Sequence, residues 1–127
     1  MKTFLLKHSL EIMAVLSAFF SPIGPLLLTT GCMLVSDLCT GIFAAHRRKE
    51  NIESAKMGRT VTKLTLYGAA IVLGHMMEVF LVNWVPIAKI TASIICTVEF
   101  KSILENIKTI TGLDIFSAIK DKLNEKR

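Results

Sequence analysis

The sequence predicts an all-α integral membrane protein, with a few long helices in a single domain over residues 1–127. Three observations support this prediction. Apolar residues make up 52% of the chain and the mean hydropathy is +0.56, both high for a soluble domain. Only 20% of the residues are charged, and no Asp, Glu, Lys, Arg or His lies between Ile12 and Ser36. Apolar runs longer than about 18 residues indicate membrane-spanning helices.

The first apolar run is too long to be one helix. Residues 12–45 would form a helix about 50 Å long, whereas the hydrocarbon core is about 30 Å thick. The segment Ser21–Pro25 holds two prolines and a glycine, which break helices. We therefore predict a first helix over about residues 4–20 and a second over about 24–46. Glu11 and the lack of a small-x-small cleavage pattern favour a retained helix over a cleaved signal peptide.

The second half of the chain predicts two further helices and a tail. A third helix is expected over about residues 61–84, before Pro86, and a fourth over about 87–110. Residues 114–127 form a basic tail whose helix has one apolar side, made of Ile115, Phe116, Ile119 and Leu123. Such a tail suits the anionic surface of a membrane.

Positive charge sets the expected orientation. The basic loop over residues 46–63 contains two carboxylates and six cations, namely Arg47, Arg48, Lys49, Lys56, Arg59 and Lys63. The turns at 21–25 and 83–87 contain no charge. We therefore predict that this loop and both termini are cytoplasmic and that both turns lie outside. This gives four spans, or three if the first helix lies in the interface.

Small and polar residues in the second and third helices indicate helix contacts. Asp37, beside Thr40, would cost roughly 2.5–3.5 kcal/mol in the bilayer centre if it were ionised and alone. It is expected either to contact another helix or subunit, or to line a wet lesion, or to be neutralised inside its own bundle. Small residues four apart let helix backbones approach closely, and two such pairs occur, Gly41 with Ala45 and Ala70 with Gly74.

Other polar side chains lie on the faces of the later helices. His75 and Glu78 are three residues apart and therefore neighbours; we favour mutual neutralisation over a proton relay. A polar ridge recurs every four residues along the fourth helix, at Lys89, Ser93, Thr97, Lys101 and Glu105. A helix with such a ridge either lines a pore or lies in the interface plane.

The sequence offers no case for an enzyme, a metal site or a cofactor. No Ser/His/Asp or Cys/His set, phosphate loop or zinc-ligand spacing is present. The net charge of +5 is concentrated at the ends of the apolar runs and lacks interleaved aromatic residues, which argues against nucleic-acid binding.

Four short motifs follow one another along the chain. The segment Asp37–Ala45 reads D-x-x-T-G-x-x-A-A, and an I-x-S-x-K pattern follows at Ile52–Lys56. Lys63 then opens the next span, and residues 99–106 read E-x-x-S-I-x-E-N, followed by Gly112. Together these motifs resemble those of one known family, the phage-lysis and toxin-secretion holins of the phi29 type. The resemblance covers about residues 25–113.

The resemblance implies a protein that forms homo-oligomers in the bacterial inner membrane and opens lesions. An endolysin or a toxin would be the cargo that leaves through them. The family has no established catalytic residues to carry over. Two other classes remain open from the residues alone: a small four-helix proton-coupled transporter, and a non-conducting scaffold with the holin fold in a larger complex.

Overall fold

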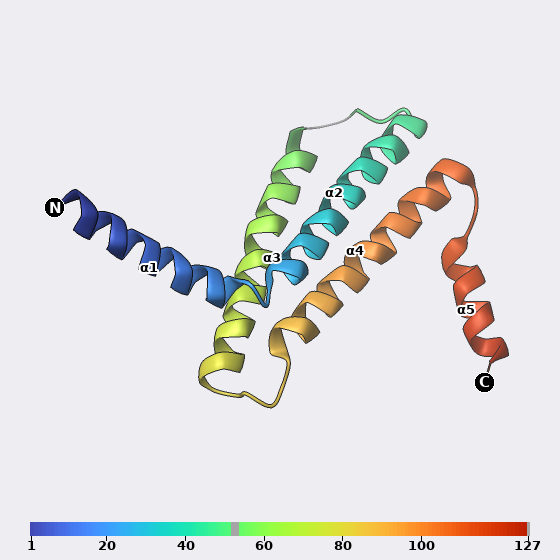
Figure 1. Cartoon of the computed structure of the whole chain (residues 1–127). Coiled ribbons are helices and arrows are strands. Elements are labelled where there is room, and N and C mark those ends of the chain that lie inside the picture. Colours follow the sequence, from blue (N-terminus) through green and yellow to red (C-terminus); the bar gives the residue numbers. More distant parts are fainter. Residues whose placement is uncertain (52–53, 127) are drawn as a thin grey trace.

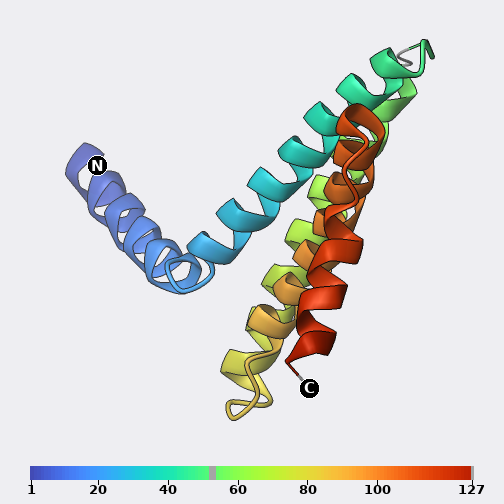
Figure 2. The same cartoon turned by 90° about the vertical axis from the view of Figure 1, so that its right-hand side faces the viewer.

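The computed structural model describes residues 1–51 and 54–126, and this part of the chain is all-helical, with no strand. Three helices pack side by side as a bundle, and one helix extends away from it at each end of the chain (Figures 1 and 2). In chain order the helices are α1 (Lys2–Phe20), α2 (Gly24–Arg47), α3 (Ser54–Phe80), α4 (Ile87–Thr111) and α5 (Ile115–Glu125). The bundle consists of α2, α3 and α4.

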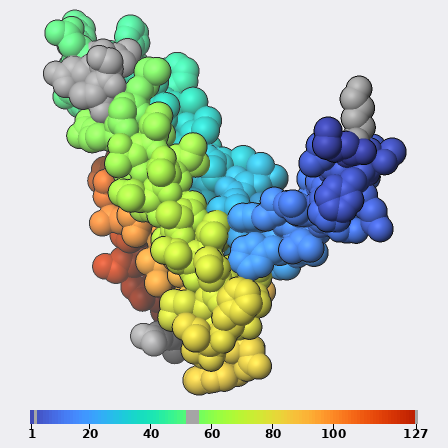
Figure 3. Space-filling view, turned by 90° about the vertical axis from the view of Figure 1, so that its left-hand side faces the viewer, coloured from blue at the N-terminus to red at the C-terminus, as the bar shows by residue number. Residues whose placement is uncertain are grey.

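The proline-rich segment separates α1 from α2 where the sequence predicts. Pro25 lies in the first turn of α2, where a missing N–H leaves no hydrogen bond unmade. None of the described side chains of α1 is buried. In Figure 3, where α3 faces the viewer, α1 projects to one side of the bundle.

The third helix differs from its expected bounds of about 61–84, because α3 begins at Ser54 and ends at Phe80. The expected start followed the apolar pattern. Backbone hydrogen bonds can extend a helix through polar residues that do not show this pattern. Much of the expected basic loop is therefore helical. At the other end, Pro86 disfavours a helical Val85, and the N–H groups of Leu81 and Val82 both donate to the Met77 carbonyl. Ile52 and Glu53 of the loop lie outside the described residues.

Two helices in the described part of the chain, α1 and α2, are long and apolar enough to cross a membrane. Four spans were expected, and α3 and α4 do not meet the same criteria. The physical reason is the charge within them, which includes Lys63 and Glu78 in α3 and Glu99 and Lys101 in α4.

The bundle has a small core and an apolar exterior. Ile23, Ile71, Ala88 and Ala92 form its buried cluster, in which two alanines let α4 approach closely. Many large apolar side chains point outward, including Val35, which is 59% exposed. An exterior of this kind fits acyl chains better than water.

The tail is a separate short helix joined to α4 by a tight turn. Gly112 ends α4 with a left-handed φ of 77°, a conformation that glycine adopts without steric strain. Asp114 then caps α5 by accepting from the Ser117 N–H at 3.0 Å. Lys108 Nζ contacts the other carboxylate oxygen of Asp114 at 2.6 Å. The apolar side of α5 is exposed or half-buried.

The cap of α5 is expected to weaken in acid. The Lys108 hydrogen bond, and then that of the Ser117 N–H, lower the Asp114 pKa from 3.8 to about 2. Because the folded-state pKa is depressed, the stabilisation is present above about pH 4 and is lost as the pH falls through about 2. The amide resonance of Ser117, followed by NMR in micelles, should shift over that range. Asp114→Asn should abolish this shift and Asp121→Asn should keep it; persistence of the shift in Asp114→Asn would contradict the assignment.

Candidate functional site

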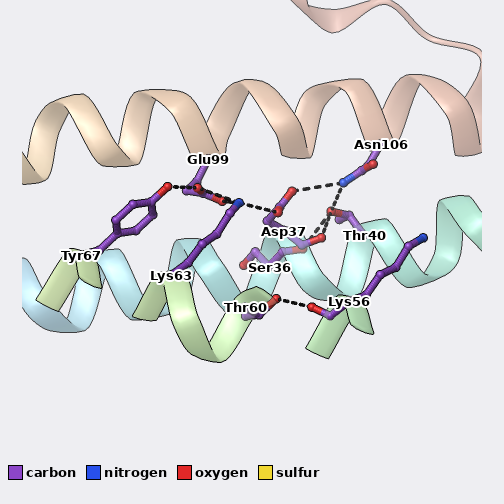
Figure 4. A network of polar contacts seen from close by, with 9 residues as sticks. All are labelled: Ser36, Asp37, Thr40, Lys56, Thr60, Lys63, Tyr67, Glu99 and Asn106. Carbon is purple, nitrogen blue, oxygen red and sulfur yellow. Dashed lines mark hydrogen bonds and ion pairs between the residues drawn. The ribbon is translucent and has the colours of Figure 1, made fainter. Parts of the chain in front are cut away.

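A buried carboxylate lies at the contact between α3 and α4. Glu99 of α4 is 1% exposed, and its two oxygens accept from Lys63 Nζ at 3.0 and 3.1 Å (Figure 4). The Tyr67 hydroxyl donates to the same carboxylate at 3.1 Å. A buried carboxylate is costly unless a cation and hydrogen-bond donors meet it. These two side chains of α3 satisfy that requirement.

Asp37 of α2 lies beside this pair. Its Oδ2 is 3.9 Å from Lys63 Nζ, and its Oδ1 accepts from Asn106 Nδ2 of α4 at 3.2 Å. Asn106 also donates to Thr40 Oγ1 at 3.2 Å. Thr40 can accept because its own hydroxyl hydrogen is directed to the Ser36 carbonyl at 2.8 Å. Asp37 therefore has partners from two other helices of its own chain.

These contacts form one polar network, consisting of Asp37, Thr40, Lys63, Tyr67, Glu99 and Asn106 (Figure 4). In it, one ammonium group lies between two carboxylates, and the hydrogen bonds join α2, α3 and α4. Within residues 1–51 and 54–126, no group of three or more His, Cys, Asp or Glu side chains could hold a metal. The network therefore holds three helices together through ion pairs and hydrogen bonds.

The polar network unites motifs that are far apart in the sequence. Asp37 and Thr40 come from the first motif and Lys63 from the start of a span. Glu99 and Asn106 come from the last motif, which does not indicate their partners. Tyr67 was missed, because an aromatic residue in an apolar helix is equally typical of packing or of the membrane interface.

A second polar contact lies near the turn between α3 and α4. His75 Nε2 donates to the Phe19 carbonyl at 3.1 Å, since a carbonyl can only accept. His75 Nδ1 lies 3.3 Å from Glu78 Oε2. The other Glu78 oxygen accepts from the Ala88 N–H at 2.7 Å, one of the N–H groups that the start of a helix leaves unpaired. The expected contact between His75 and Glu78 is present, and the further hydrogen bonds of these two residues attach α1 and α4 to α3.

The small residues lie at helix contacts within the chain. Gly74 is buried, and a Cβ built on it would lie 3.3 Å from the Ala88 backbone. Ala45 is fully buried and Ala70 is half-buried. At Gly41 a Cβ would lie at an ordinary 3.6 Å from Asn106 Nδ2.

The polar ridge of α4 points away from the rest of the bundle, and all five of its residues are exposed. The Ser93 and Thr97 hydroxyls each donate to the carbonyl four residues earlier at 2.8 Å. Lys101 Nζ lies 3.7 Å from Glu105 Oε1. The contacts of these four ridge residues therefore lie within α4 itself and do not join α4 to the other helices of the bundle.

The basic residues lie at the end of the bundle where α2 meets α3. Arg47, Arg48 and Lys49 lie at the end of α2, whereas Lys56, Arg59 and Lys63 lie on the first three turns of α3. Arg48 Nε contacts Glu50 at 2.9 Å. The hydrogen bond from Arg48 lowers the Glu50 pKa.

A family model matches most of the chain. It describes the bacteriophage holin family and matches residues 14–126, a range that includes the polar network and all of the helices α2 to α5. Comparisons with curated proteins and with solved structures give no match.

Proposed function

The chain belongs to the bacteriophage holin family, and from that premise we propose that it oligomerises in the bacterial inner membrane and opens lesions. An endolysin or a toxin would leave the cell through them. In this proposal the polar network holds each copy together, and the polar ridge of α4 faces other copies or water.

The exposed ridge is the observation that carries this proposal. Lys101 follows the buried Glu99 by two residues, about 3 Å along the helix axis, and therefore lies at the depth of the polar network. The side chains of Lys101 and Glu105 are 64% and 67% exposed. A charge facing lipid at that depth costs roughly 2.5–3.5 kcal/mol on insertion scales. Contact with further copies, or with water in a lesion, removes this cost.

We propose four spans, with both termini and the basic segment on the cytoplasmic side. The junction of α2 with α3 and the end of α4 lie at one end of the bundle, and the turn from α3 to α4 lies at the other (Figure 1). This arrangement separates the cations of residues 47–63 from the uncharged turn, as the positive-inside rule requires.

Expression of the chain alone in a bacterial host tests the function. We expect growth arrest and release of a large cytoplasmic enzyme into the medium, because lesions large enough for a folded cargo also pass such a marker. Accumulation of the chain in the inner membrane without release of the marker would reject lesion formation.

A paired substitution tests the role of the ridge in the same assay. Lys101→Leu with Glu105→Leu should strongly delay release of the marker, since it removes the charges that require partners or water. The matched control is Lys122→Leu with Glu125→Leu, which removes an exposed pair 3.3 Å apart in the tail. Equal release from both variants at equal membrane accumulation would contradict the role of the ridge.

A further inference from the structure

A basic pocket opens at the end of the bundle where α2 ends and α3 begins. Its volume is about 260 Å³. Four of its lining residues are cations, Arg48, Lys56, Arg59 and Lys63, and Asp37 is the carboxylate that lines it. Thr60, Ser102 and Asn106 add polar groups from α3 and α4.

Two of the four cations are already paired. Lys63 contacts Glu99 and Asp37, and Arg48 contacts Glu50. Among the residues that the structure describes, Lys56 and Arg59 have no carboxylate within ion-pair distance. They are three residues apart on one face of α3, near its N-terminus, where the helix dipole also favours an anion.

An apolar groove adjoins the basic pocket, mainly along α2 and with Leu64 of α3 in its lining. It has a volume of about 450 Å³, and its lining includes Leu28, Val35 and Leu64. The linings of the two cavities meet at consecutive residues, Ser36 and Asp37 on α2 and Lys63 and Leu64 on α3. A cationic pocket followed by an apolar groove matches an amphiphile with an anionic head better than it matches a free ion.

We propose that this pocket binds the phosphate of an anionic phospholipid headgroup, held by Lys56 and Arg59, with an acyl chain along the groove. Basic pockets between membrane helices on the cytoplasmic side bind such headgroups through charge and hydrogen bonds. The bound lipid would bridge the end of α2 and the start of α3. Such binding involves a single chain and does not require lesion formation.

Binding of a fluorescent phosphatidylglycerol to the full chain in neutral detergent tests the proposal. Lys56→Gln with Arg59→Gln should weaken binding about thirtyfold, as expected for the loss of two cations near an anionic lipid. The control Lys120→Gln with Lys122→Gln removes the same charge from the exposed tail and should leave the affinity nearly unchanged. Equal losses in the two variants, or no loss in the first, would overturn the proposal.

Two further arms separate the lipid from its phosphate. Millimolar inorganic phosphate should not displace the labelled lipid, whereas unlabelled phosphatidylglycerol should displace it and phosphatidylcholine should do so poorly. Displacement by inorganic phosphate alone would show a free-phosphate site and overturn the lipid assignment. The charge-conserving variant Lys56→Arg with Arg59→Lys should retain binding; far-UV circular dichroism checks that each variant keeps its helices.

Discussion

Lys63→Ala is expected to destabilise the bundle by about 3 kcal/mol, the lower end of the usual effect of removing one partner of a buried ion pair, because Glu99 is buried but the Lys63 side chain is 40% exposed. Glu99 is 1% exposed, and without Lys63 it would keep only the Tyr67 hydroxyl, 3.1 Å away, as a donor. Asp37 would lose its cation in the same substitution. Equilibrium unfolding in mixed micelles, followed by circular dichroism, measures the change in the free energy of unfolding.

A matched control is available in the tail. Lys122→Ala removes the same side chain from a pair in which both partners are largely exposed, and such pairs contribute at most about 1 kcal/mol. A similar loss of stability in both variants would contradict the special role of Lys63. The double variant Lys63→Met with Glu99→Met should recover most of the stability, because apolar residues of similar size replace buried ion pairs at little cost. A double variant as unstable as Lys63→Ala would mean that the defect arises elsewhere.

The helices could be predicted from the sequence because their signals are local. Pro22 and Pro25 break the first apolar run, and Gly112 adopts the left-handed conformation that ends α4. The start of α3 could not be placed in the same way, since an apolar pattern reports which part of a helix is buried or in lipid. The polar turns from Ser54 to Thr60 carry no such pattern, although they are helical.

The polar network was only partly predictable, because it depends on how the helices face one another. Asp37 stands out in the sequence because an ionised carboxylate is costly in lipid. The sequence does not decide between its possible contacts, since its partners are distant along the chain. Asn106 is separated from Asp37 by 69 positions, and Lys63 from Glu99 by 36. A single sequence shows that Glu99 and Asn106 belong to one motif. It does not show that this face of α4 meets both α2 and α3.

The contact of α3 with the start of α4 is likewise indicated in the sequence only by a pair of small residues. The Ala70–Gly74 spacing predicts a close approach, and the structure gives the approaching segment as Ile87 and Ala88. In the same place, Glu78 accepts from the Ala88 N–H at 2.7 Å. The absence of a side chain at Gly74 and the carboxylate of Glu78 therefore position the first turn of α4 together.

Gly74→Leu is accordingly expected to disrupt the attachment of α4 to α3. The Cβ alone would lie 3.3 Å from the Ala88 Cα and N atoms and from Ile87 Cγ2, so the rest of a leucine side chain has no space without displacement of backbone. Overpacking of this kind typically costs about 1–3 kcal/mol or more, and the displacement would also break the hydrogen bond from the Ala88 N–H to Glu78. Unfolding in mixed micelles measures the loss.

Gly68→Leu is the matched control on the same helix. No atom outside the local helix lies within 4 Å of a Cβ at Gly68, and leucine is a better helix former than glycine by up to about 1 kcal/mol. We therefore expect Gly68→Leu to leave the stability unchanged or slightly raised while Gly74→Leu lowers it. Equal stabilities in the two variants would mean that α4 does not approach α3 at Gly74, and the cap that Glu78 provides for α4 would lose its geometric basis.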